Sequence, residues 1–118
     1  MIPYFGIGLI GLVGVLISCD DGVTASTCES HVPDSKTDCP SGCTYSVYLD
    51  TIVEDGVCTG WASSPSAGCI KTVGEEMNID ECYMRVTEDG TQYREFGTIY
   101  DEIVGWRRIG TCPCPPLP

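Results

Sequence analysis

Basic residues are scarce in this sequence, which has six lysines and arginines and one histidine against 17 aspartates and glutamates. The formal net charge at pH 7 is −11, and no charged side chain occurs before Asp20. A strongly acidic surface is repelled by phosphate backbones and by anionic lipid. The composition therefore argues against nucleic acid as a partner. It favours cations, basic proteins or sugars, unless the charge serves solubility alone.

Large apolar side chains are also few. After Cys19, only 17 of 99 residues are Leu, Ile, Val or Phe, a proportion close to that of chains that stay disordered. Two Trp, five Tyr and eight further cysteines in the same region favour a folded domain. A domain of this size with a thin core needs cross-links, and one native disulfide contributes about 2–5 kcal/mol. We therefore expect disulfides to be the main reason that the chain folds.

Catalytic and cofactor-binding signatures are missing from the sequence. It has no nucleophile elbow, no phosphate-binding loop and no H-E-x-x-H motif. The single histidine, His31, lies in a polar stretch and is interpreted as a solvated linker residue. Adjacent acids such as Glu75 and Glu76 are interpreted as a solvated face, and the hairpin tips lack the spacing of a calcium loop. The sequence predicts a protein that is not an enzyme and holds no cofactor.

Residues 1–18, MIPYFGIGLIGLVGVLIS, form a nearly continuous apolar run. Nineteen uncharged residues could just span a bilayer, but Pro3, four glycines and the acidic pair that follows the run oppose a stable span. We interpret residues 1–18 as a signal peptide, which departs from the usual pattern in having no Lys or Arg near its start. An uncleaved anchor is the alternative.

The end of this run, Leu16-Ile17-Ser18-Cys19, resembles the lipobox of bacterial lipoprotein precursors. The resemblance implies that Cys19 is the lipidation site: its sulfur receives a diacylglyceryl group, the signal peptide is cut before it, and the new amino terminus is open to acylation. It covers only about the first 20 residues and implies nothing about the fold beyond. The expected location is the cell envelope, on the non-cytoplasmic side of a bacterial membrane, with ordinary secretion as the alternative.

The number of cysteines supports this interpretation independently. The sequence has nine cysteines, so at least one cannot form a disulfide within the chain. A cysteine left unpaired in an exported protein needs an explanation. If Cys19 carries lipid, eight disulfide candidates remain, with 105 possible connectivities: Cys28, Cys39, Cys43, Cys58, Cys69, Cys82, Cys112 and Cys114. Zinc is the less favoured alternative, because no C-x2-C pair occurs. Pro113 separates the last two cysteines, so we expect two separate cross-links there and no strained redox-active ring.

The chain after the signal peptide divides into three parts by composition. Residues 19–38 hold the lipid-bearing cysteine and an acidic, Ser- and Thr-rich stretch that is typical of a flexible tether, although Cys28 interrupts it. Residues 39–111 form a cysteine-rich β domain. Residues 112–118, CPCPPLP, form a proline-rich tail that cannot continue a sheet and is expected to be extended.

Two hairpins are predicted in the domain, because Asp-Gly follows a run of β-forming residues at Asp55-Gly56 and again at Asp89-Gly90. The first would place Val53 opposite Cys58 and Ile52 opposite Thr59. The second would place Val86 opposite Tyr93 and Arg85 opposite Arg94, a repulsive pair unless an acid or a bulge intervenes. The predicted fold is a small all-β, disulfide-rich domain of four to six short antiparallel strands.

Other segments are predicted with weaker signals. Residues 62–68 read as a loop, residues 69–73 as a short strand, residues 75–82 as one or two helical turns, and residues 99–109 as a last strand with a bulge or close contact at Gly105. With few aliphatic residues available, we expect the aromatic rings to form the core on the disulfides. An exposed aromatic patch for a sugar or protein is the alternative.

Two functions follow from these features. The first is a lipid-anchored interaction or structural module of the envelope, which binds an unknown protein or glycan and acts without catalysis. The second is a soluble secreted inhibitor or effector that presents a disulfide-braced loop, such as residues 62–68, to another protein.

Overall fold

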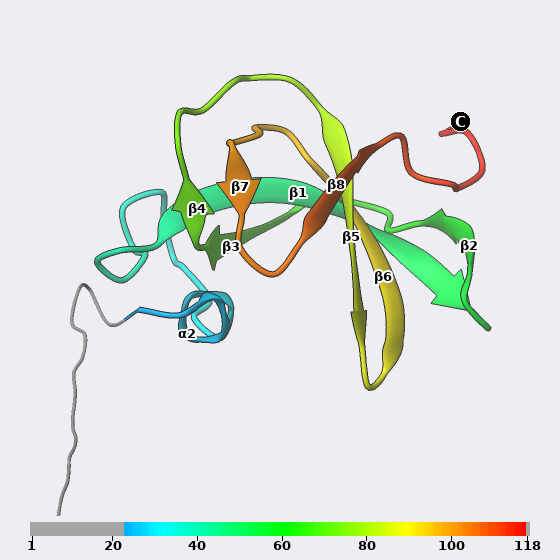
Figure 1. Ribbon diagram of the computed structural model, residues 1–118, viewed down its shortest axis with the longest axis horizontal. Helices are drawn as coiled ribbons and strands as arrows, with labels where there is room; N and C mark the ends of the chain where they lie inside the picture. The colour runs from blue at the N-terminus through cyan, green and yellow to red at the C-terminus, as the bar shows by residue number, and fades with distance from the viewer. Residues whose placement is uncertain (1–22, 118) are drawn as a thin grey trace, which may run out of the picture.

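A computed structural model describes residues 23–117, which form an antiparallel β domain with one short helix (Figure 1). The small, β-dominated, disulfide-rich fold predicted from the sequence is confirmed. The main sheet has six strands in the order β2-β1-β6-β5-β8, with β3 attached to β1, and β4 and β7 form a second sheet. The strands are β1 (Thr44–Glu54), β2 (Val57–Trp61), β3 (Ser66–Ile70), β4 (Thr72–Val73), β5 (Glu81–Thr87), β6 (Gly90–Phe96), β7 (Glu102–Ile103) and β8 (Arg107–Gly110).

The long strand β1 organises the main sheet, and it curves across the whole domain in Figure 1. Its first half pairs with β3 and its last four residues pair with β2. On the other edge, only the short middle stretch from Tyr48 to Asp50 pairs with β6. The eleven residues of β1 are rich in β-branched and aromatic types, which fit a pleated surface.

The first predicted hairpin is confirmed at its turn. Asp55 and Gly56 both have positive φ, 52° and 79°, as a two-residue turn of this handedness requires. Val53 lies opposite Cys58 as expected. A bulge between Ile52 and Val53 then places Ile52 opposite Gly60, so the predicted pairing with Thr59 is wrong by one residue.

The second hairpin exists, but its predicted register is wrong. Thr87 pairs with Gly90, so the turn is Glu88-Asp89 and not Asp89-Gly90. Arg85 consequently faces Gln92, and its Nε donates to the amide oxygen Oε1 of Gln92 at 2.6 Å. In this register the two arginines of the hairpin are no longer opposite each other, which removes the repulsion that the predicted register would cause.

Three further expectations are corrected by the tertiary pairing. Residues 75–80 contain no helix: they run as irregular chain with an isolated bridge between Met77 and Ile99, and β5 begins at Glu81. Three of the seven residues of the expected loop at residues 62–68 belong to β3 and pair with β1. The expected last strand is broken at Gly105, whose φ is +92°, into β7 and β8.

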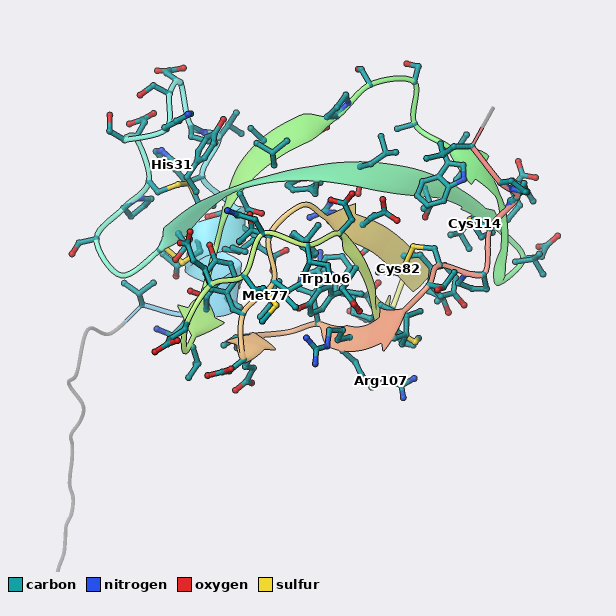
Figure 2. The ribbon with its side chains drawn as sticks, turned by 90° about the horizontal axis from the view of Figure 1, so that it is seen from above. His31, Met77, Cys82, Trp106, Arg107 and Cys114 are labelled. Atoms are coloured by element: carbon teal, nitrogen blue, oxygen red, sulfur yellow. A yellow bond between two sulfur atoms is a disulfide. The ribbon has the colours of Figure 1, made fainter. Side chains whose placement is uncertain are left out.

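The hydrophobic core is built mainly from aromatic rings, as predicted. Phe96 is fully buried and meets the rings of Tyr83 and Trp106 edge-on, at centroid distances of 5.2 and 5.7 Å. Tyr48 packs against the same cluster. Trp106 lies at the centre of the domain in Figure 2. Trp61 is the exception among the two tryptophans, because it lies outside the core cluster.

The described part of the expected tether is folded onto the domain. Helix α2 (Ala25–Glu29) begins at Thr24, whose hydroxyl accepts the N–H of Thr27 at 3.1 Å. Cys28 is fully buried and is bonded to Cys43. A five-residue helix is too short to be stable alone, so this disulfide and the packing on β3 hold it. Within residues 23–117 no helix is long and apolar enough to cross a membrane.

Candidate functional site

All eight cysteines that were predicted to form disulfides do so. The bonds are Cys28–Cys43, Cys39–Cys69, Cys58–Cys114 and Cys82–Cys112. The last two cysteines therefore belong to two separate cross-links, as expected. In the part of the chain that the structure describes, no group of three His, Cys, Asp or Glu side chains is arranged to hold a metal ion. Cys19 and the rest of the lipobox lie outside the described residues.

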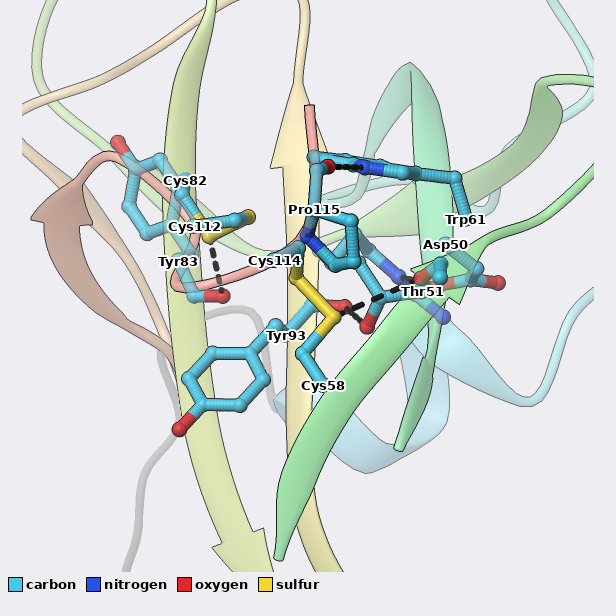
Figure 3. The surroundings of a disulfide bond; sticks show 12 residues. Asp50, Thr51, Cys58, Trp61, Cys82, Tyr83, Tyr93, Cys112, Cys114 and Pro115 are labelled. Atoms are coloured by element: carbon cyan, nitrogen blue, oxygen red, sulfur yellow. Dashed lines mark hydrogen bonds and ion pairs between the residues drawn. A yellow bond between two sulfur atoms is a disulfide. The ribbon is translucent and has the colours of Figure 1, made fainter. Parts of the chain in front are cut away.

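The proline-rich tail is attached to the domain at three points, the first being the Cys82–Cys112 disulfide that ties it to β5 (Figure 3). The Cys58–Cys114 disulfide ties it to β2, and the indole N–H of Trp61 donates to the carbonyl oxygen of Pro115 at 2.6 Å. An open, largely apolar groove of about 580 Å³ lies between the chain around Trp61 and residues 115–117. The tail thus completes one wall of a groove beside the one tryptophan that is outside the core.

A second feature is a stack of arginines and aromatic rings on one face of the main sheet. The guanidinium carbon of Arg94 lies 3.8 Å from the centroid of the Tyr48 ring and 4.9 Å from that of Trp106. The guanidinium of Arg85 lies over Trp106 at 4.1 Å. A cation held over an aromatic face at these distances is attracted by the ring, and more so where water is excluded.

Two carboxylates neutralise this stack. Glu29, from helix α2, lies 2.8 Å from Arg85 and accepts the indole N–H of Trp106 at 3.3 Å. Asp50, from β1, accepts from Nε of Arg94 at 2.6 Å. A cavity of about 160 Å³ lies beside the stack. Because each cation has its own carboxylate, the balance of charge favours a structural role that ties α2 to β5 and β1 to β6.

The third feature is a cleft of about 290 Å³ where β1 and β6 separate, and we call it the β1–β6 fork. It is lined by three residues of β1 and four residues of β6: Asp50, Thr51, Val53, Thr91, Gln92, Tyr93 and Arg94. The Asp50–Arg94 ion pair closes its base. Just above, the hydroxyl of Thr51 donates to the carbonyl oxygen of Tyr93 at 2.7 Å. Beyond these contacts the two hairpins diverge, as Figure 1 shows.

Negative charge is concentrated at the tips of the two hairpins that form the fork. The β1–β2 tip carries Glu54 and Asp55, and the β5–β6 tip carries Glu88 and Asp89, all exposed. The walls of the fork are polar or aromatic except at Val53. Together the four acids make the two tips a local concentration of negative charge.

Perturbed ionisable groups lie elsewhere. Burial raises the pKa of the Tyr83 and Tyr100 hydroxyls above their usual range. Burial, and next the nearby charge of Asp80, raises the pKa of the Glu95 carboxyl. His31, predicted to be a solvated linker residue, is partly exposed and belongs to the folded domain: it lies 3.5 Å from Asp38, at the end opposite Cys114 (Figure 2). None of these groups lines the fork.

The sequence did not predict the fork or the arginine stack. The two Glu-Asp-Gly tips were visible, but their positions relative to each other depend on the pairing of β1 with β6. No family model matches this chain, and no curated protein or solved structure is detectably similar to it.

Proposed function

We propose that this chain is an exported, lipid-anchored interaction module on the non-cytoplasmic side of a bacterial membrane, acting without catalysis. The observation that carries the proposal is the pairing of the cysteines: the eight after residue 19 bond to one another and leave Cys19 as the odd one. The lipobox-like sequence that ends at Cys19 supplies a chemical role for that single thiol.

The four disulfides are consistent with an extracytoplasmic or secreted location, since cytoplasmic thiols are kept reduced. Stable attachment by acyl chains takes two or more of them, which a diacylglyceryl group on sulfur supplies. The folded domain begins at Thr24 and not near residue 39. Five residues reach at most about 17 Å, so the anchor would hold the domain close to the bilayer surface.

The structure weakens the alternative of a soluble inhibitor that presents residues 62–68. Ser66, Ala67 and Gly68 pair with β1 along one main-chain edge of β3, which shortens the unpaired loop to residues 62–65. Ser66 and Ala67 keep exposed side chains.

Expression of the full chain in a bacterium tests the proposal. We expect the protein to partition into the detergent phase, and its amino-terminal peptide to carry a diacylglyceryl mass on Cys19. The Cys19→Ala variant is the control and should lose both properties while keeping four disulfides by mass after alkylation without reduction. A wild-type protein that is soluble and unmodified at Cys19 would refute the anchor and support secretion.

A further inference from the structure

We propose that the β1–β6 fork binds an extended, basic segment of a partner protein, which adds as a strand to the free edge of β6. The inference rests on the proposed role as an interaction module and names the class of its partner. Its support is the direction of the main-chain groups in the fork, the size of the cleft and the charge around its mouth.

The free edge of β6 follows from the register of its hairpin. Thr87 and Gly90 flank a two-residue turn, so they form a hydrogen-bonded pair, and so do Arg85 and Gln92. The alternate residues of β6, Thr91 and Tyr93, therefore direct their main-chain groups away from β5, towards β1. The bond from the Thr51 hydroxyl to the Tyr93 carbonyl agrees with this direction. At Thr91 the pairing of β6 with β1 has already ended.

β1 forms the second wall with the same alternation. The carbonyl oxygen of Val47 accepts the main-chain N–H of Gly97 at 3.3 Å, and Leu49 pairs with Glu95. The odd-numbered residues of β1 therefore direct their main-chain N–H and C=O groups towards β6. Asp50 instead gives its carbonyl to the N–H of Ala62, on the β2 side. Thr51 and Val53 therefore also direct main-chain groups into the fork. An open strand edge of this kind is a template for another strand.

The cleft has the size and charge for such a segment. Its volume of about 290 Å³ lies at the lower end for small-molecule clefts, roughly 300–1,000 Å³, so only a few residues of the segment would enter it. The cation at its base, Arg94, is bonded to Asp50, so the uncompensated charge at the mouth is that of the four acids at the two tips. An added strand that carries Lys or Arg side chains would place them among these carboxylates, which favours association and its rate.

The opposite edge of the same hairpin offers a matched comparison. β8 pairs with β5 only as far as Met84, so the main-chain groups of Val86 also point to an open edge. An open cleft of about 400 Å³ lies there, but its lining includes the cation Arg107 as well as Arg85, which is paired with Glu29. A basic segment is disfavoured by this positive lining and favoured by the fork.

The test uses the full chain, purified from the expressing bacterium in non-ionic detergent. The probe is an eight-residue peptide of alternating Lys and Val, and the comparison peptide alternates Glu and Val. Affinities are measured by fluorescence anisotropy at low and moderate salt, and amide hydrogen exchange of ¹⁵N-labelled protein is followed by NMR. We expect the Lys peptide to bind more tightly, and to slow the exchange of the Thr91 amide.

Two proline variants locate the strand. Thr91→Pro removes one main-chain donor from the fork, and Val86→Pro removes the corresponding donor from the opposite edge; proline is tolerated at edges where the N–H is not part of a ladder. We expect Thr91→Pro to weaken binding about tenfold and Val86→Pro to leave it unchanged. Should Thr91→Pro not fold, the Glu54→Gln/Glu88→Gln variant keeps every main-chain donor and should weaken binding of the Lys peptide at low salt.

Three results would overturn the proposal: no binding of the Lys peptide at millimolar concentration, greater sensitivity to Val86→Pro than to the fork variants, or equal affinity for both peptides. The outcome of this binding test is independent of the outcome of the test for a lipid anchor on Cys19. A protein that is acylated on Cys19 but does not bind the peptide retains the proposed localisation and loses this partner. A protein that binds the peptide without acylation gives the reverse result.

Discussion

Removal of Cys58–Cys114, one of the two disulfides that hold the tail, gives the sharpest test of how this thin-cored domain is stabilised. Cys58 and Cys114 are 56 residues apart, but the Cys82–Cys112 bond provides a shortcut. The chain runs from Cys58 to Cys82, crosses to Cys112 and continues to Cys114, so the closed loop counts only about 26 residues. On the chain-entropy model, opening such a loop costs about 3.5 kcal/mol of stability. That is a large part of the total for a small domain, about 5–15 kcal/mol.

The variant is Cys58→Ser/Cys114→Ser, with both thiols removed so that neither can exchange with the other disulfides. Unfolding in guanidinium chloride is followed by the fluorescence of Trp106, which is buried in the native core. We expect a loss of about 3–4 kcal/mol and a melting temperature lower by roughly 15–25 °C. Trp61→Phe is the control, because it removes only the bond to Pro115 and should cost about 1 kcal/mol.

A double serine variant that loses less than about 1 kcal/mol would contradict the reasoning. It would mean that non-covalent packing supplies most of the stability, in spite of the few aliphatic residues. A loss equal to that of Trp61→Phe would likewise show that the tail contributes only through its indole contact.

Three further changes test other parts of the structure. Phe96→Ala, at a fully buried ring, should cost about 3–5 kcal/mol by denaturant unfolding, whereas Val86→Ala, at a side chain that is 71% exposed, should change stability by less than about 0.5 kcal/mol; similar losses would place the core elsewhere. In a double-mutant cycle of Glu29→Gln and Arg85→Met, we expect a favourable coupling of about 1 kcal/mol that salt reduces only slightly, because both side chains are mostly buried; zero coupling would remove the pair from the account of how α2 is held. Burial and the charge of Asp80 raise the folded-state pKa of Glu95, so the stability that the protonated carboxyl contributes is present below pH 4.5 and is lost as the pH rises through the folded pKa. The Glu95→Gln variant should therefore be more stable than wild type at pH 7 and equally stable at pH 3. Equal stability at pH 7 would contradict the raised pKa.

Turns were predicted correctly from the sequence where neighbouring residues alone decide the structure. Asp55-Gly56 forms its turn as predicted because both residues tolerate positive φ, which few others do. The second tip carries the same three residues, yet its turn moves by one position and uses Glu88-Asp89. That register also sets Tyr83 opposite Arg94, which reaches across to Asp50 on another strand, and such a contact cannot be inferred from the hairpin alone.

The helical turns predicted at residues 75–82 are absent for a related reason. A short segment with helix-forming glutamates and a methionine has only a weak preference, and tertiary pairing overrides it. Met77 exchanges main-chain hydrogen bonds with Ile99, and the strand that follows is fixed by its neighbours on both sides. The prediction of a flexible tether was limited in the same way. The polar composition of the segment is typical of a tether, but the Cys28–Cys43 disulfide attaches it to the domain.

The sequence by itself determined the β character of the domain, the set of cysteines available for cross-links, the aromatic nature of its core and the odd parity that sets Cys19 apart, because composition, counting and turn chemistry are local properties. Tertiary structure alone decided which cysteines bond and where strand edges stay open. Two sulfurs can join only when folding brings their Cα atoms within about 7 Å, as it does at 5.0–5.7 Å for all four pairs. The β1–β6 fork likewise arises because two hairpins pair over a short stretch and then diverge. No single stretch of sequence specifies where that pairing ends.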